Sequence, residues 1–476
     1  MLVSTLECYF KGRKELFKGL AIDSLETEWK EYPVIRFDFN GNNYTKVGEL
    51  ESTLKSFVDS LEEEYGKDSN AVTLGERFRA ILKKTHEKTG LRVVVLIDEY
   101  DKPLLDVLDT GLKVTVDGEE RLLEDWHRQV LKSFYGVFKG ADEDLRFVFL
   151  TGVTKFSQVS VFSDLNQLDD ISMTISFEAI CGITEEELYE KMGEPIKEMA
   201  KANMLSEEEM KHELKLQFDG YHFSPAMTDI YNPFSILNAL KYQIIDNYWF
   251  RTGTPTYLVR LLAHTNEQMN ELTGKYYPTQ DFIDYKADVE APLPMIYQSG
   301  YLTVKGYNRR TRSYLLDFPN NEVKMGFTTL LTSSYLKPKD NPVLQVIDAM
   351  ENGDMEQLKH LFTSFLASIP YRQRRKDDER EKERYFQYTF YLIMSMISSY
   401  TVFIEKEQGE GRVDCLVETT HDVYIFEFKL DGSAEAIQQI EDKGYAREYE
   451  SDPRRIHKIG CNFSSQTGTI DGWEVG

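Results

Sequence analysis

Residues 1 to about 180 alternate between the hydrophobic spacing of helices and that of strands. Amphipathic helices are predicted at 4–20, 74–90 and 123–139, and apolar strands at 32–40, 92–97 and 145–153. Strands that alternate with helices in this way predict a parallel sheet covered on both faces. Ligands of such sheets bind at the carboxyl ends of the strands.

The rest of the chain changes pattern several times. Helical spacing prevails from about 181 to 290, and a stretch rich in Gly, Pro and Asn starts a helix after Pro233. Strands at 301–307 and 313–318 flank a polar turn, which predicts a hairpin, and a helix follows at 321–336. This helix and hairpin resemble a winged helix. We therefore predict an α/β multidomain protein with units at 1–180, 181–290, 291–369 and 370–476.

Composition adds limits to this picture. The chain has 476 residues, of which 41% are hydrophobic, and no run of about 18 apolar residues that could span a membrane. Its first residues lack the features of a secretory signal. The four cysteines are far apart, so we predict reduced core residues rather than disulfides or zinc ligands: Cys8, Cys181, Cys415 and Cys461. Together these features predict a cytoplasmic protein without membrane contact.

The charge balance bears on nucleic-acid binding. A formal net charge of −24 argues against a surface that coats nucleic acid indiscriminately, but it leaves room for a local basic groove. The one candidate is "YRQRRKDDEREKER" (371–384), with seven Lys or Arg against five Asp or Glu. Mixed signs at helical spacing favour a solvated helix face over a stripe that contacts DNA.

The strand at 92–97 runs directly into acidic residues. In nucleotide-triphosphate enzymes such residues hold Mg²⁺ and polarise a water, roles that would fall here to Asp98 and Glu99. Thr151 ends the next strand of this pattern and could sense the γ-phosphate. On these residues alone, a buried strand capped by carboxylates at a helix start is an equally good interpretation.

Such a site also needs a loop that cradles phosphates. Its motif would be G-x-x-x-x-G-K-[ST], and the sequence contains none. The Gly-Lys pairs are Gly66-Lys67, followed by Asp68, and Gly274-Lys275, followed by Tyr276. Without the backbone amides and lysine of that loop, nothing offsets the charge of a triphosphate.

The C-terminal region carries a second acidic pattern, with strands at 411–418 and 423–430. Side chains alternate along a strand, so Glu427 and Lys429 share one face. If residues 419–422 form the turn, Asp414 lies directly opposite Glu427. Facing carboxylates repel each other unless a cation such as Mg²⁺ or Mn²⁺ lies between them. With Lys429 to orient a water or a phosphate, this geometry fits metal-assisted phosphodiester hydrolysis.

A structural interpretation competes with this chemistry. Asp414 could instead form an ion pair with Arg412 or Lys429 at a strand edge. Because E-x-K triplets are common by chance, the pattern alone favours that interpretation.

The whole chain resembles a bacterial and archaeal family of uncharacterised proteins that joins an AAA-like ATPase domain to a C-terminal PD-(D/E)XK nuclease-like domain. The matching blocks are "LVSTLECYF", "LFKGLAI", "YPVIRFDF", "VVVLIDEYDKPL", "FLTGVTKFSQVSVFSDLNQLDDIS", "FDGYHFS", "YNPFSILNAL", "NYWFRTGTPTYLV", "YQSGYLTVKGY" and "FPNNEVKMGF". The resemblance implies an AAA-like parallel sheet with a helical lid at 181–290, and a restriction-endonuclease-like α/β domain at the end. It also implies nucleic acid as partner and possible oligomers through the AAA-like domain.

Carried over position by position, the resemblance assigns metal binding to Asp414 and Glu427 and a catalytic role to Lys429. It matches further positions that are acidic or polar in the family: Glu383, Glu405, Gln439 and Tyr445. For Gln439, a plain surface glutamine is an equally good interpretation. The resemblance implies a vestigial nucleotide site at Asp98, Glu99 and Thr151.

Family members begin some tens of residues earlier, with a Gly-Lys-Ser phosphate loop, and "LVSTLECYF" resembles the helix directly after it. We therefore expect the loop and the first strand to be missing from the chain as given, ATP binding to be doubtful and hydrolysis to be poor. The best prediction is a metal-dependent nuclease coupled to this ATPase-like part. The alternatives are a regulatory protein of mobile elements or defence that binds nucleic acid without cutting it, and a degenerate remnant.

Overall fold

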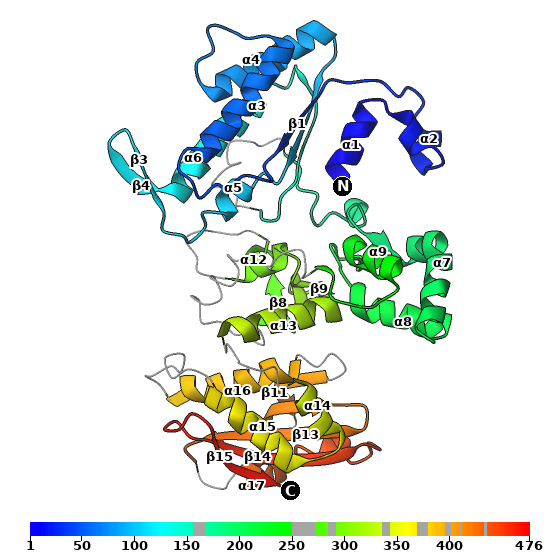
Figure 1. Cartoon of the computed structure of the whole chain (residues 1–476), viewed down its shortest axis with the longest axis vertical. Coiled ribbons are helices and arrows are strands. Elements are labelled where there is room, and N and C mark those ends of the chain that lie inside the picture. Colours follow the sequence, from blue (N-terminus) through cyan, green and yellow to red (C-terminus); the bar gives the residue numbers. More distant parts are fainter. Residues whose placement is uncertain are drawn as a thin grey trace.

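A computed structural model describes residues 1–155, 168–249, 272–283, 292–335, 343–368, 379–395, 401–408, 411–432 and 436–476. Three parts follow one another along the longest axis in chain order (Figure 1). An α/β part lies at one end, a mixed part in the middle, and a C-terminal sheet with its helices at the other end. Two segments of the region with helical spacing, 250–271 and 284–291, lie outside the described residues.

The N-terminal part contains most of the predicted alternation. Its elements are α1 (Leu2–Phe10), α2 (Ala21–Leu25), β1 (Val34–Asp38), α3 (Glu49–Tyr65), α4 (Leu74–Thr89), β2 (Val93–Asp98), α5 (Lys102–Leu105), β3 (Lys113–Val116), β4 (Glu119–Leu122), α6 (Leu123–Tyr135) and β5 (Leu145–Leu150). The strands β1, β2 and β5 form a parallel sheet in the order β1-β2-β5. This confirms the predicted parallel sheet.

Both faces of the parallel sheet are covered. On one face Val93, Val95 and Ile97 pack into the main hydrophobic core with residues of α3, α4 and α6. On the other face Val94 and Leu96 pack against α1. Continuous burial of β2 explains why its sequence is an apolar run rather than an alternating one.

Helix boundaries in this part follow local chemistry. Thr73 and Glu76 form a capping box at the start of α4, and Gly90 ends it with a φ of +68°. The amphipathic stretch at 4–20 is not one helix, because α1 ends at Phe10 and a short 3₁₀ turn follows. Gly12 has a φ of +66°, and a Cβ there would lie 2.8 Å from Glu31 Cγ. The chain turns where only glycine fits easily.

The middle part combines helices with a small sheet. Its elements are β6 (Ile183–Thr184), α7 (Glu185–Ala202), α8 (Glu207–Phe218), β7 (Ile230–Tyr231), α9 (Pro233–Tyr242), β8 (Lys275–Pro278), α12 (Leu293–Gln298), β9 (Thr303–Asn308), β10 (Ser313–Asp317) and α13 (Asn321–Tyr335). The predicted hairpin is present as β9 and β10. A strand that the sequence pattern did not predict, β8, pairs with β10 and gives the sheet order β8-β10-β9.

The C-terminal part is a five-stranded sheet in the order β11-β12-β13-β14-β15. Its elements are α16 (Glu379–Ser395), β11 (Thr401–Gln408), β12 (Gly411–Glu418), β13 (Asp422–Leu430), α17 (Ala436–Asp442), β14 (Arg455–Phe463) and β15 (Ile470–Val475). The pair β13 and β14 is parallel, and α17 connects them across one face. The other face packs on α16, where Phe390 lies 5.3 Å from Phe426 between ring centroids.

Two helices, α14 (Val343–Glu351) and α15 (Met355–Ser368), pack on the C-terminal sheet (Figure 1). Phe362 of α15 stacks on Phe390 of α16 at 3.6 Å between ring centroids. Tyr424 of β13 donates a hydrogen bond to the carbonyl of Met350 in α14. The structure therefore places these helices with the final domain, although the sequence pattern grouped them with the hairpin.

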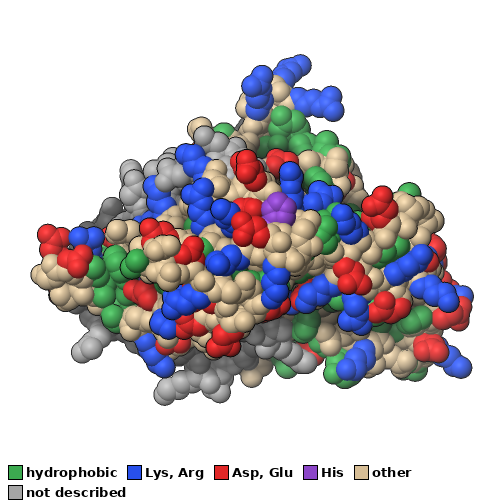
Figure 2. All heavy atoms as spheres, turned by 90° about the horizontal axis from the view of Figure 1, so that it is seen from above, with side chains coloured by type: hydrophobic (Ala, Val, Ile, Leu, Met, Phe, Trp, Pro, Cys, Tyr) green, Lys and Arg blue, Asp and Glu red, His purple; other side chains and the backbone are tan. Residues whose placement is uncertain are grey.

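The described residues also test the predictions from composition. All four cysteines are free, but only Cys415 and Cys461 are buried, while Cys8 is half-buried and Cys181 is exposed. Figure 2 shows acidic and basic side chains intermixed over the face seen from above. Among the helices in the described ranges, none has the length and apolar character needed to cross a membrane. The basic segment at 371–384 lies mostly outside the described residues.

Candidate functional site

The strand pair β12 and β13 has the register that the turn length predicts. Cys415 lies opposite Phe426, and Leu416 lies opposite Ile425. Continued by one residue, this antiparallel register puts Asp414 opposite Glu427. Burial along β13 explains the arrangement, because its residues 422–428 are all buried and the strand lies in the middle of the sheet.

The side chain of Asp414 reaches the backbone of the neighbouring strand beside Glu427. Asp414 Oδ2 accepts a hydrogen bond from the backbone N–H of Phe428 at 2.7 Å, next to Glu427 in the chain. Glu427 itself is 1% exposed. Burial of a carboxylate is costly unless a cation or hydrogen bonds compensate its charge. A cation bound here would therefore be held by two oxygen donors.

Lys429 supplies the positive charge at this point. Its Nζ lies 2.8 Å from Glu427 Oε1 and donates to Gln439 Oε1 at the same distance. The side chain of Lys429 is 29% exposed, so it also faces solvent. Gln439 comes from α17 and contacts Lys429, a contact that both interpretations of this glutamine allow. An ion pair between Lys429 and Glu427 fits a structural interpretation as well as a catalytic one.

The close approach of α17 depends on a glycine that sequence reasoning missed. Gly460 of β14 lies beside Glu427 in the parallel register. A Cβ on Gly460 would lie 2.9 Å from the backbone N of Ile437 and 3.0 Å from Cβ of Ala436. The bare glycine thus lets the first turn of α17 lie directly on the sheet and bring Gln439 to Lys429. An isolated Gly inside a strand is the sequence signal that could have indicated this contact.

The remaining predicted site residues are placed as follows. Tyr445 is 1% exposed, and its hydroxyl donates to the carbonyl of Arg412 at 2.9 Å. It therefore anchors the start of β12, two residues before Asp414. Glu383 lies in α16 and Glu405 in β11, but their side chains are outside the described part of the structure.

The donor set suits a hard cation. Asp414 and Glu427 offer carboxylate oxygens, which Mg²⁺ and Mn²⁺ prefer as ligands. Across the residues that the structure describes, no three His, Cys, Asp or Glu side chains gather into a metal-binding group. The described candidate ligands are thus a pair, and any further ligand would come from a backbone carbonyl, water or a side chain outside that set.

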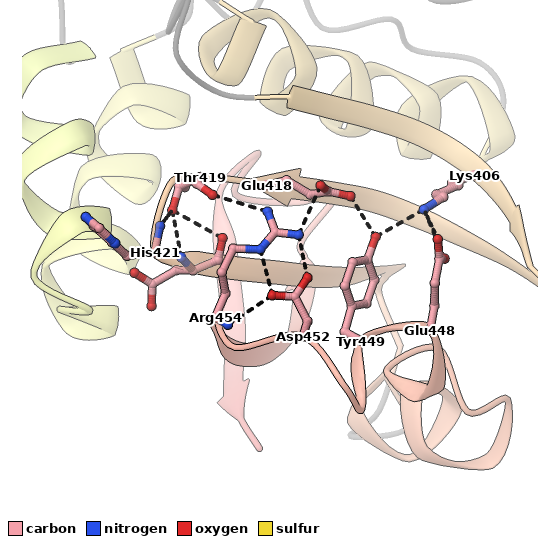
Figure 3. Close-up of polar contacts among 9 residues, drawn as sticks. Lys406, Glu418, Thr419, His421, Glu448, Tyr449, Asp452 and Arg454 are labelled. Carbon is pink, nitrogen blue, oxygen red and sulfur yellow. Dashed lines mark hydrogen bonds and ion pairs between the residues drawn. The ribbon is translucent and has the colours of Figure 1, made fainter.

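A second polar cluster lies four residues along β12 from Asp414 (Figure 3). Arg454 lies 2.7 Å from Asp452 and 3.2 Å from Glu418, and the hydroxyl of Tyr449 donates to Glu418 at 2.8 Å. The hydrogen bonds from Arg454 lower the pKa of Asp452 to about 2. These acids and bases pair with one another, which is typical of a cluster that stabilises a strand end.

The N-terminal sheet brings together two of the three residues predicted there. Thr151 Oγ1 donates to Asp98 Oδ1 at 3.3 Å, at the carboxyl ends of β5 and β2. Arg36 of β1 joins them, with Nη2 3.5 Å from Asp98 Oδ2 and Nη1 3.2 Å from Glu7 Oε2. Sequence reasoning missed Arg36, although a cation within an apolar strand indicates a polar partner nearby.

Glu99 and Asp101 lie just after β2. Glu99 has a φ of +57°, and burial together with the charge of Asp98 raises its pKa. Asp101 is fully buried and accepts a hydrogen bond from the backbone N–H of Thr154, and burial raises its pKa to about 7. A carboxyl group that keeps its proton up to about neutral pH thus lies beside the strand end.

The loop after β5 reaches the middle part. Tyr100 donates to the carbonyl of Thr154 at 2.7 Å, and Thr154 Oγ1 lies 3.6 Å from Met295 Sδ in α12. The N–H of Lys155 donates to Oε1 of Gln298 at 2.7 Å. The acidic end of β2 is therefore connected to α12 through two residues of one loop.

Comparisons with known proteins match the two ends of the chain to different protein families. Residues 1–162 match the family model described as predicted AAA-ATPase, and residues 381–473 match the PD-(D/E)XK nuclease superfamily. An uncharacterised protein in the vnfD 5′ region of Azotobacter chroococcum mcd 1 is 31% identical over 484 residues, which cover 100% of this chain and 89% of that protein. No solved structure matches the chain. The chain therefore belongs to the same family as the Azotobacter protein, with an AAA-ATPase-like domain followed by a domain of the PD-(D/E)XK nuclease superfamily.

Proposed function

We propose that this protein is a metal-dependent nuclease whose C-terminal domain hydrolyses phosphodiester bonds in DNA or RNA. The observation that carries the proposal is the register of β12 and β13, which continued by one pair puts Asp414 opposite Glu427, with Lys429 contacting both Glu427 and Gln439. The match of residues 381–473 to the PD-(D/E)XK superfamily supports the same chemistry.

In this proposal the carboxylates bind the cation and the lysine contacts the phosphate. Asp414 and Glu427 would hold one divalent cation, which when bound supplies an activated water and neutralises phosphate charge. An ammonium group has three donors, and Lys429 directs two of them to Glu427 and Gln439. The third can donate to a phosphate oxygen. Gln439 and Glu427 thus hold the ammonium group of Lys429 beside the proposed cation site, where the side chain is 29% exposed.

The test is cleavage of labelled DNA and RNA by the purified full chain with Mg²⁺ or Mn²⁺. We expect Asp414→Asn and Lys429→Met each to lower the rate at least about 100-fold, the scale on which positioned acid–base and charged groups contribute. Binding of Mn²⁺, followed by calorimetry, should be lost in Asp414→Asn and kept in Lys429→Met.

Lys458→Met is the matched control. Lys458 also extends from the sheet to α17, where its Nζ lies 2.6 Å from Glu441 Oε1, and its side chain is 24% exposed. This variant should cleave at the wild-type rate. Cleavage that continues unchanged in Asp414→Asn, or is lost equally in Lys458→Met, would overturn the proposal.

For the N-terminal domain we propose that ATP hydrolysis is not its activity in this chain. Asp98, the residue that would hold Mg²⁺, lies 3.5 Å from Arg36, a single cation that also pairs with Glu7 and Asp38. The sequence offers no G-x-x-x-x-G-K-[ST] loop to neutralise a triphosphate. We propose that this domain acts as a scaffold, connected to the middle part through Thr154 and Lys155.

A further inference from the structure

The turn between β9 and β10 presents a compact basic group. Its four residues are exposed and read Arg309, Arg310, Thr311 and Arg312. Oδ1 of Asn308 accepts hydrogen bonds from the N–H of Arg310 at 3.0 Å and of Thr311 at 3.3 Å. The side chain of Asn308 therefore holds the turn in one conformation and keeps the arginines together at its tip.

Within the described ranges, no hydrogen bond or ion pair involves the guanidinium groups of Arg309, Arg310 and Arg312. Other arginines behave differently, since Arg77 pairs with two carboxylates and Arg454 pairs with two as well. In a chain with 80 acidic and 56 basic residues, carboxylates are the commoner partners. A set of arginines without such partners is thus available to an external anion.

The sheet below the tip is rigid and aromatic. Tyr314 of β10 lies opposite Tyr307 of β9 on one side and opposite Tyr277 of β8 on the other. The rings of Tyr307 and Tyr314 lie 4.7 Å apart between centroids, and Tyr314 also contacts Phe282 at 5.7 Å. This tyrosine row packs the base of the hairpin, so the backbone that carries the arginines is already ordered before a ligand binds.

We propose that this arginine tip, residues 309–312, binds the phosphate backbone of the nucleic acid. Guanidinium groups match phosphate oxygens with paired hydrogen bonds, and several on one rigid turn suit a repeating polyanion better than a single anion. The identity of the bound polymer as substrate rests on the proposed nuclease function; the binding itself does not. The tip would place the polymer on the middle part, separate from the residues that would cut it.

The test is binding of fluorescently labelled duplex DNA, single-stranded DNA and RNA to the full chain, measured by anisotropy in EDTA. The variant is Arg309→Gln, Arg310→Gln and Arg312→Gln together. We expect at least about a tenfold loss of affinity, and a smaller salt dependence because each lost phosphate contact removes roughly 0.7 to 0.9 from the log–log slope. Circular dichroism should be unchanged, since all three side chains are exposed.

The control removes equal charge elsewhere, with Lys191→Gln, Lys197→Gln and Lys201→Gln on α7, and should change affinity less than about twofold. Wild-type affinity in the arginine variant, an equal loss in the control, or equally good competition by polyglutamate would overturn the proposal.

Tip-dependent binding without Mg²⁺-dependent cleavage would refute the nuclease function alone. Cleavage that Asp414→Asn abolishes, with unchanged binding by the arginine variant, would refute the tip alone.

Discussion

At the scale of the residue, the surroundings of a carboxyl group decide its charge. Asp101 and Asp452 have the same side chain, yet burial raises the pKa of Asp101 to about 7, while Arg454 lowers that of Asp452 to about 2. Asp101 lies beside the end of β2 and receives a hydrogen bond from Thr154. Its protonation therefore affects the stability of the fold at the acidic strand end.

Asp101→Asn should make the free energy of unfolding less dependent on pH. Because the folded-state pKa of about 7 lies above the ordinary 3.8, the folded chain keeps a proton that the unfolded chain releases. Wild-type stability from this group is present below about pH 4 and lost as pH rises toward 7. The asparagine keeps an oxygen for Thr154, so the variant should be more stable at about pH 8, by at most about 4 kcal/mol.

Urea unfolding followed by tryptophan fluorescence at about pH 5 and pH 8 measures this difference. Asp452→Asn is the control and should change the free energy of unfolding in the opposite direction. The pKa of Asp452 is lowered in the folded chain, so its charged form stabilises the fold above about pH 3.8. A wild-type advantage over Asp101→Asn that grows with pH would contradict the prediction.

At the scale of the element, the candidate site depends on how closely α17 packs on the sheet. The first turn of α17 lies where a Cβ of Gly460 would otherwise be, and the helix carries Gln439 to Lys429. Gly460 contacts neither a substrate nor the reacting groups, so it is a positioning residue. Its effect should therefore reach cleavage only through the place of α17.

Gly460→Ala should displace α17 and weaken cleavage. The added methyl group would lie 2.9 Å from the backbone N of Ile437, closer than real Cβ contacts allow. A shift of about 1 Å in a positioned group costs up to about 100-fold in rate. We expect kcat to fall at least about tenfold with Mn²⁺ binding retained, and the backbone amides of α17 to exchange faster with deuterium.

Gly193→Ala is the matched control, because a Cβ on Gly193 meets nothing within 4 Å. It should leave cleavage and the exchange of α17 unchanged. Normal kcat in Gly460→Ala, or a kcat loss without faster exchange in α17, would show that the contact does not position Gln439.

At the scale of the whole molecule, the two family domains lie at opposite ends of the chain and of the long axis (Figure 1). The N-terminal sheet contacts α12 of the middle part through Thr154 and Lys155. The helices α14 and α15, which follow the hairpin region in sequence, pack on the C-terminal sheet. Any influence of one domain on the other would pass through the middle part.

Cleavage by the C-terminal domain should not require ATP. In the proposed scheme Arg36 pairs with Asp98 and the given sequence contains no phosphate-loop motif, so we expect nucleotide to bind weakly. We expect Mg²⁺·ATP to change the cleavage rate by less than about twofold and Asp98→Asn to behave like the wild type. The measurement is cleavage with and without ATP, together with phosphate release. ATP stimulation that Asp98→Asn abolishes would refute this prediction.

A structural feature could be predicted from the sequence when the residues that determine it lie close together in the chain. The run at 92–97 and the strands at 411–418 and 423–430 follow from spacing, because side chains alternate along a strand and a short turn sets the register. That register is confirmed by Cys415 opposite Phe426. The helix at 74–90 could also be predicted, because Thr73 and Glu76 at its start and Gly90 at its end lie in or next to the helix itself.

The sequence by itself thus determined the parallel sheet, the hairpin and the register of β12 against β13. Only the tertiary structure decided that Arg36 pairs with Asp98, that β8 joins the hairpin, and that α17 brings Gln439 to Lys429. The first group depends on periodicity and turn length, which a short segment contains. The second depends on packing between segments separated by many residues, where the fit of whole elements selects the neighbours.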